Sequence, residues 1–345
     1  MNKKRVLLAI LTGTMLLQIG CGTSKAGSDE KSVGKVLEDK QLCDNVTLDD
    51  SFEIEDDIPT DVKVYSAEVV DYDKADVVET FGVDENQLEV ISEEYGVYQA
   101  GDINFTISSG VSTSMFIQTK NADYYHSYDS YYADYVSDDD LTFCDRETAI
   151  KDAESVLKKM GMDSLTCYES YALPLEYHKK VEEDAAEEGF GNESLSDEQW
   201  QALGDCYELI FTSKIDDIDM EPEGYVASDD SACNGGKIVV FYNADGIAYL
   251  DAANRYATTD DGESVDVIDG ENILSSLKEK MDSQILTSNY RVMSENLEYY
   301  PSLIDIKENK FELIPVWKIT LQSDDEEEGN IEYLFDAQSG KELIC

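Results

Sequence analysis

Histidine is scarce in this sequence, which has two, His126 and His178, in 345 residues. Neither stands in a pair spaced for metal binding, and the sequence contains no HExxH, GxSxG, P-loop or GxGxxG motif. A pair of carboxyl groups could still perform acid–base chemistry, but no pair stands out among 76 acidic residues. We therefore predict a protein that is not an enzyme and needs no cofactor.

Basic residues are also few, with 26 Lys and Arg against 76 Asp and Glu and a formal net charge of −50. Each contact to a nucleic-acid phosphate needs a cation, and an anionic membrane surface would repel this chain. The composition excludes nucleic acid as a partner and favours basic partners or divalent cations. Solubility of an exported protein explains the same charge more simply.

Long apolar runs are missing except at the N-terminus, where residues 6–19 follow Lys3, Lys4 and Arg5. This run is shorter than the roughly 20 residues of a membrane-spanning helix. It is typical of a signal peptide, which we assign to residues 1–20.

Cys21 follows Gly20 directly at the end of this run. The arrangement is similar to the lipobox of bacterial lipoproteins, although Gln18 stands where Leu is usual. We predict cleavage before Cys21 and a lipid anchor on its thiol, which places the chain on the outer face of the cell membrane. The alternative is ordinary signal-peptide cleavage after Ala26, which would leave no anchor.

Residues 21–58 are polar and acidic, and we predict that they form a flexible tether because they offer little apolar area to bury. Six cysteines remain after lipidation of Cys21. Outside the cytoplasm they could form three disulfides in any of 15 pairings, and their pairing stays open. No CxxC spacing occurs, which argues against a redox motif or a zinc knuckle.

A duplicated pattern occupies the C-terminal two thirds of the chain. Asp145 is placed to cap a helix over residues 145–161 that carries apolar residues at helical spacing and ends at Gly161. The same pattern returns over residues 269–281. Two strand segments match in register, residues 207–215 and 311–319. Two further segments, residues 238–246 and 331–340, resemble each other as strands that run into turns with Gly.

Two insertions lengthen the first copy. Residues 178–205 are predicted to form acidic surface helices with a capping box from Ser196 to Gln199, and residues 216–235 a loop. We divide the chain after the tether into an N-terminal αβ subdomain (59–134), a first unit (135–257) and a second unit (258–345). In the subdomain, residues 73–81 are expected to be helical and residues 103–107 to form a strand.

The segments DRETAIKDAESVLKKMGM, FELIPVWKI and FDAQSGKELI together resemble the PepSY-like domains found in envelope proteins and lipoproteins of Gram-positive bacteria. The resemblance covers residues 135–345. It implies an α+β fold of tandem units, each with one helix packed on a curled antiparallel sheet. It also implies a regulatory, inhibitory or binding module, and it carries over no catalytic residue.

Tyr124, Tyr128, Tyr131 and Tyr135 would lie on one face if residues 121–135 formed a helix. Such rings give rigid contact area for a peptide, a glycan or a protein partner. Aromatic residues at helical spacing more often close a core, which is the interpretation we favour over a binding surface.

Runs of acidic residues offer weak calcium sites, and the one over residues 324–328 comes nearest to a known loop. Phe335 stands where an EF-hand needs Glu, so solvated loops are the better interpretation and no metal ligand is assigned. We therefore expect a membrane-tethered module that binds an envelope protein or peptide. The alternative is a lipoprotein that binds a small ligand or calcium beside a transporter, and a deep cleft would favour it.

Overall fold

Strands dominate the protein, with 41% of the described residues against 23% in helices. The computed structural model describes residues 40–343 except 55–57, 111, 190–194, 224, 229–230, 234 and 326–328. Cys21, the N-terminal part of the predicted tether, Cys345 and Glu326–Glu328 lie outside these residues. A large mixed sheet of 17 strands runs through the molecule, and β11 (Tyr225–Ser228) and β12 (Ser231–Cys233) pair separately.

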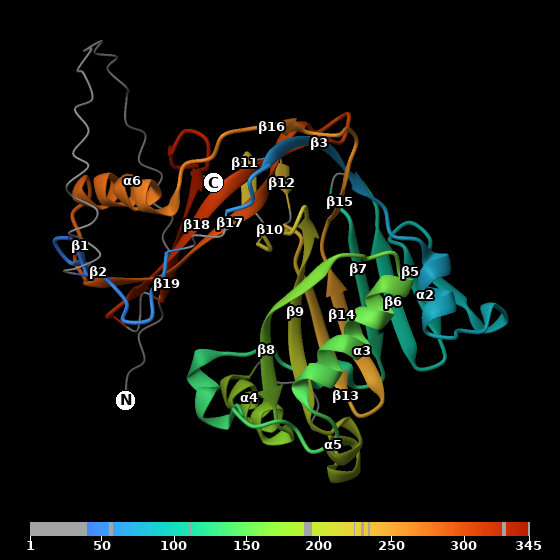
Figure 1. Cartoon of the computed structure of the whole chain (residues 1–345). Coiled ribbons are helices and arrows are strands. Elements are labelled where there is room, and N and C mark those ends of the chain that lie inside the picture. Colours follow the sequence, from blue (N-terminus) through green and yellow to red (C-terminus); the bar gives the residue numbers. More distant parts are fainter. Residues whose placement is uncertain are drawn as a thin grey trace, which may run out of the picture.

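One half of this sheet, which we call the α3 lobe, is antiparallel throughout, in the order β4-β5-β6-β7-β14-β13-β9-β8. Its strands are β4 (Glu89–Ser92), β5 (Val97–Ala100), β6 (Ile103–Ser108), β7 (Ser114–Thr119), β8 (Leu165–Leu173), β9 (Cys206–Ile215), β13 (Ile238–Asn243) and β14 (Gly246–Ala252). Helix α3 (Arg146–Lys159) covers one face and buries Ala149, Ala153 and Leu157 (Figure 1). Helix α2 (Lys74–Thr80) packs beside α3, whereas α4 (Leu175–Glu188) and α5 (Asp197–Leu203) pack in a separate core with Leu173 and Cys206.

The other half, the α6 lobe, is built on a long hairpin of β17 (Tyr290–Asp305) and β18 (Lys310–Ser323). β19 (Asn330–Asp336) and β3 (Lys63–Val70) pair with β18, and β15 (Arg255–Thr258) and β16 (Glu263–Ser264) pair with β3. Helix α6 (Gly270–Asp282) lies over this part of the sheet (Figure 1) and buries Ile273, Leu274 and Leu277 in a second core.

A short strand, β10 (Ile218–Met220), connects the lobes. It is antiparallel to β9 on one side and parallel to β17 on the other. The two halves are therefore parts of one hydrogen-bonded sheet.

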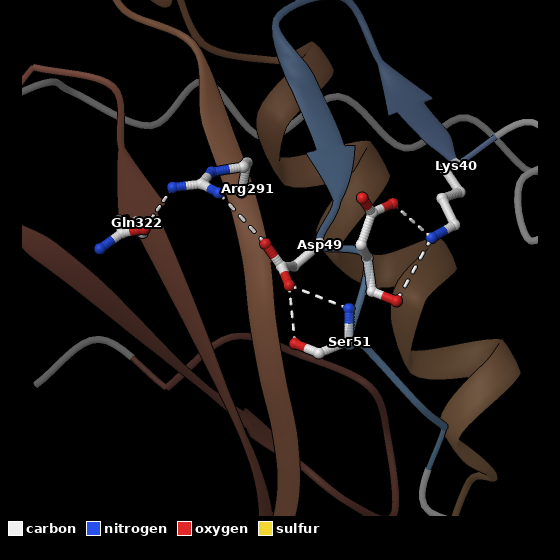
Figure 2. Close-up of polar contacts among 6 residues, drawn as sticks. Lys40, Asp49, Ser51, Arg291 and Gln322 are labelled. Carbon is white, nitrogen blue, oxygen red and sulfur yellow. Dashed lines mark hydrogen bonds and ion pairs between the residues drawn. The ribbon is translucent and has the colours of Figure 1, made fainter. Parts of the chain in front are cut away.

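The N-terminal hairpin of β1 (Gln41–Cys43) and β2 (Val46–Leu48) is fastened to β17 by parallel pairing and by a polar cluster. Figure 2 shows the carboxylate of Asp49 accepting from both the backbone N–H and the hydroxyl of Ser51 and facing Arg291. The Asp49 carboxylate lies 3.2 Å from the Arg291 guanidinium. Arg291 also donates to Gln322 at 2.6 Å. These contacts lower the pKa of Asp49, chiefly through the hydrogen bonds from Ser51.

Several predicted elements are confirmed. Asp145 caps α3 by accepting from the Thr148 backbone N–H at 2.7 Å, and Asp269 caps α6 in the same way on Asn272 at 2.8 Å. The capping box of Ser196 and Gln199 is present at the start of α5. Helix α2 lies within residues 73–81, as expected.

The predicted fold class, an α+β chain of tandem helix-on-sheet units, is wrong, because the strands form one large mixed sheet. Strand β7, which we had placed in the N-terminal subdomain, pairs with β14 of the first unit, and β3 pairs with β18 of the second. The proposed boundary between residues 257 and 258 cuts β15. Apolar alternation identifies strands but does not show which edges will meet, and this is why the prediction failed.

The predicted tether, residues 21–58, extends too far toward the C-terminus. Residues 41–48 form β1 and β2, and Leu42, Val46 and Leu48 are buried in the core under α6. These few apolar side chains are enough to order the segment because β17 supplies hydrogen-bond partners for its backbone. No helix among the residues that the structure describes is long and apolar enough to cross a membrane.

A candidate ligand-binding cleft

A cleft of about 660 Å³ lies where the two lobes meet. Strands β8 and β9 of the α3 lobe line one side, and β17, β18 and β19 of the α6 lobe line the other, with β10 between them. The polar face of the α6-lobe sheet forms part of the cleft lining. Ligand pockets typically measure roughly 300–1,000 Å³, so the cleft has room for a small molecule.

Strand alternation explains why this face is polar. On β17, Leu297 and Tyr299 point into the core under α6, so Asn296 and Glu298 project to the opposite side. On β18, Trp317 and Ile319 are buried in the same core, while Lys318 and Thr320 line the cleft. Asn296 and Lys318 are cross-strand partners, as are Ser294 and Thr320.

Lys318 is the central cation of the cleft floor. Its Nζ lies 3.3 Å from Glu221 Oε1 and 3.1 Å from Glu332 Oε2, and its side chain is only 9% exposed. Burial by itself would lower the pKa of Lys318, but Glu221, Glu298 and Glu332 outweigh it and raise the pKa above its ordinary value. The lysine is therefore charged and held in place by carboxylates.

Glu298 forms a carboxyl pair with Glu221. Burial, followed by the negative charge of Glu221, raises the pKa of Glu298 from 4.5 to about 9, and the two side chains share a hydrogen bond. Two carboxylates cannot hydrogen-bond unless one holds a proton. The two carboxyl groups therefore share one proton.

Donors are in short supply on this floor. Asp219 Oδ1, Glu221 Oε2 and Glu298 Oε2 are buried oxygen atoms that make no hydrogen bond to a donor in the described part of the chain. The shared proton can serve two of them, and Lys214 approaches Asp219 no closer than 3.8 Å. A buried acceptor without a donor costs about 1–3 kcal/mol, so the proton shared by Glu298 and Glu221 stabilises this part of the protein.

Side chains on the opposite wall of the cleft also form polar contacts with one another. Thr212 donates its hydroxyl to the Met220 carbonyl at 2.6 Å, and Lys237 pairs with Glu223 at 2.8 Å. Tyr168 also lines the cleft, where burial and the charges of Glu223 and Glu169 raise its pKa. The wall thus offers one aromatic ring among charged groups.

The four tyrosines predicted to share a helical face do not share one. The chain forms two short 3₁₀ helices, Ala122–Tyr124 and Ser130–Tyr135, because Asp129 accepts from the Tyr131 backbone N–H and starts a new turn. Tyr124 is 8% exposed and packs edge-on against Trp200, as the core-closing interpretation requires. Tyr131, in contrast, is 88% exposed, and Tyr135 is 42% exposed.

Tyr128 links this segment to the cleft. It stacks on Tyr171 with ring centroids 4.2 Å apart, and the Tyr171 hydroxyl donates to Glu169, which lines the cleft. The predicted tyrosine surface is therefore split between core, stacking and exposed positions. Its role in binding stays a prediction.

The two histidines meet although 52 residues separate them. His178 is fully buried, and its Nδ1 accepts the backbone N–H of His126 at 3.1 Å, so its Nε2 carries the proton and faces Cys206 Sγ at 3.3 Å. Burial lowers the pKa of His178 to about 3 and raises that of Cys206 far above normal. A neutral histidine beside a protonated thiol is a packing contact, not an activated nucleophile.

Neither disulfides nor metal sites appear in the described part of the chain. Cys43, Cys144, Cys167 and Cys206 are free thiols, and no group of three or more His, Cys, Asp or Glu is arranged to hold a metal ion. Asp324, from the acidic run considered for calcium, instead accepts from the backbone and side chain of Asn289 at 2.9 and 2.7 Å.

Sequence reasoning missed the cleft residues. Lys318 gave one signal, because it is a cation in the middle of an apolar strand segment, and such a residue needs a buried partner. Glu221 lay in a segment that we had assigned to an inserted loop, and nothing in the sequence joined it to Lys318.

Comparison with known proteins shows that this fold is similar to that of a solved structure. No protein-family model matches the sequence, and no curated protein matches it either. The fold is similar to that of an uncharacterized protein from Eubacterium rectale ATCC 33656, seen in a crystal structure, with a TM-score of 0.63 and 14% sequence identity. The match covers 92% of this chain and 99% of that one. At this identity the likeness concerns the fold alone.

Proposed function

We propose that the protein is a lipid-anchored binding protein of the cell envelope and that its cleft takes a small polar ligand. The observation that supports this is a cleft of about 660 Å³ whose lining carries charged side chains of both signs, among them Asp219, Glu298 and Lys318. A small polar ligand would pair with such groups. Of the two functions considered from the sequence, the small-ligand one fits this cleft better than an interface for an envelope protein.

The lipid on Cys21 would keep the cleft near the outer face of the membrane. The chain after Cys21 would then reach from the anchor to β1. The cleft acids are held by Lys318 and by a shared proton, an arrangement suited to binding. We therefore retain the proposal that the protein is not an enzyme.

Thermal-shift screening of the full mature protein in mild detergent tests the proposal. The panel should contain cationic, neutral and anionic small molecules, each measured on wild type and on Thr320→Trp, which fills the cleft. We expect at least one compound to raise the melting temperature of the wild type and not of the variant. A panel without such a compound, together with a stoichiometric protein partner recovered from membranes, would contradict it.

A further inference from the structure

A second pocket, of about 350 Å³, lies beside β15 where the two lobes meet, and we call it the Arg255 pocket. Its lining shares a single residue, Lys214, with that of the large cleft. It is therefore a separate site, and its ligand is independent of the function proposed for the cleft.

Apolar side chains from both hydrophobic cores line this pocket. Ile215 and Tyr256 pack in the core under α6. The core under α3 contributes four more side chains: Tyr72, Met162, Leu165 and Ile238. Ligand pockets are commonly lined in this way and commonly lie where two structural units meet. The lining therefore favours a ligand with an apolar body.

The charge of this pocket is the reverse of that of the whole chain. Two cations, Arg255 and Lys214, line it together with one acidic residue, Asp163, which also lies 3.6 Å from Lys158. Lys214 lies 3.8 Å from Asp219, so Arg255 is the main cation of the pocket. In a chain with 76 acidic and 26 basic residues, this local excess of positive charge favours an anionic ligand.

Backbone carbonyls hold the Arg255 guanidinium in place. It donates to the carbonyls of Gly161 at 2.9 Å, Asp71 at 3.2 Å and Met160 at 3.4 Å. Its Cζ lies 5.5 Å from the ring centroid of Tyr72. Gly161 permits this approach, because a Cβ at that position would lie 2.8 Å from Arg255 Nη1. The guanidinium is thus positioned before a ligand binds.

These contacts leave the charge of Arg255 available. All three acceptors are carbonyls, and no carboxylate forms an ion pair with Arg255 in the described part of the chain. The carbonyls at the end of α3 offset the charge only in part. The bonds come from Nη1 and Nη2, and Nε keeps a donor that no described residue accepts. Such a guanidinium is suited to binding a carboxylate.

We propose that the Arg255 pocket binds a small molecule with an apolar body and one carboxylate group. The body would lie among the side chains of the two cores, and the carboxylate would pair with Arg255. Aromatic acids and short fatty acids share this chemistry, and their relative affinities distinguish the two sources.

Isothermal titration calorimetry on the full mature protein tests this with three carboxylates: phenylacetate, indole-3-acetate and hexanoate. Each is compared with its primary amide, which keeps the shape and removes the charge. We expect at least one acid to bind at one site per chain and its amide to bind about tenfold more weakly or less. If no acid binds, or if each acid and its amide bind equally well, the inference is wrong.

Two variants test the role of Arg255. Arg255→Gln should weaken binding of the acid by about tenfold or more and leave binding of the amide unchanged. Arg146→Gln is the matched control, because Arg146 also donates to a backbone carbonyl, that of Ser170, and lies over a tyrosine ring, but outside the pocket. It should bind the acid like wild type. Equal weakening in both variants would mean that overall charge attracts the acid, and it would overturn the inference.

A third variant keeps every charge and serves if Arg255→Gln does not fold. Ala257 follows two residues after Arg255 on β15 and lines the pocket, so Ala257→Phe should fill it and abolish binding of the acid. Thr320→Trp fills the large cleft instead and should leave this binding unchanged. Loss of binding in Thr320→Trp alone would place the acid in the cleft, which would contradict this inference and support the proposed function.

Discussion

Lys318 Nζ lies 3.3 Å from Glu221 Oε1, although 97 residues separate the two in the sequence. This ion pair joins β18 of the α6 lobe to the segment just after β10, the strand that connects the lobes. Both side chains are less than a tenth exposed. The pair therefore contributes to the junction of the lobes as well as to the cleft floor.

Replacing Lys318 by Met should lower the free energy of unfolding by about 3 kcal/mol, because it leaves buried carboxylates without their cation. Urea denaturation followed by circular dichroism measures the change. The double variant with Glu221→Gln should recover part of the loss, since it removes the unpaired charge. A single change that costs less than about 1 kcal/mol, the range of exposed pairs, would mean that the pair is screened by water.

The shared proton makes stability depend on pH. The folded state keeps the proton of Glu298 up to a pKa of about 9, whereas the unfolded state loses it near 4.5. This group's contribution is complete below pH 4.5 and is lost as the pH rises through about 9. The melting temperature of the wild type should fall more steeply between pH 6.5 and pH 9 than that of Glu298→Gln. The control variant Glu312→Gln removes one carboxyl group from an exposed position on β18, and its melting temperature should follow that of the wild type.

His178 produces the opposite trend in acid. Because its folded pKa is lowered from 6.5 to about 3, the unfolded state takes up the proton first, and stability falls as the pH drops through this range. His178→Gln can still accept from the His126 backbone N–H through its side-chain carbonyl. Its melting temperature should fall less than that of the wild type between pH 6.5 and pH 4.5; parallel curves would show that His178 is not the titrating group.

The tyrosines of residues 121–135 should separate into structural and exposed positions. Tyr124→Ala should cost about 3 kcal/mol, because it removes a ring packed against Trp200 in the core. Tyr131→Ala should change stability by less than about 0.5 kcal/mol, since the side chain is 88% exposed. Chemical denaturation of both variants gives the comparison, and a large loss for Tyr131→Ala would contradict the exposed placement.

The proposed lipid anchor on Cys21 has a direct test. Cys21→Ser should move the protein from the membrane fraction to the soluble one and should abolish labelling with a fatty-acid analogue. Cys43→Ser is the matched control, because Cys43 is a buried thiol of β1 and should leave both readouts unchanged. Continued labelling of Cys21→Ser would contradict the assignment of the lipid anchor to Cys21.

Local structure could be predicted from the sequence, but the arrangement of the strands could not. Asp145 and Asp269 identified helices α3 and α6 because capping and helical periodicity involve neighbours within a few residues. The pairing of β3 with β18, or of Glu221 with Lys318, depends on which distant edges meet, and hydrophobic alternation is nearly the same for every candidate partner. The cleft was missed for the same reason, since its floor combines β10, β17 and β18.

The position of β3 also has a consequence for the order of folding. The Tyr299 hydroxyl donates to the Lys63 carbonyl across 236 residues, and the Asn309 side chain donates to the Val69 carbonyl across 240. A chain that is made from its N-terminus has no partner for β3 until β15 and β18 have been synthesised. Residues 63–70 must wait as an unpaired segment for most of that time, so the α6 lobe forms late and slowly. In an exported protein, this delay would keep the leading part of the chain extended while it crosses the membrane.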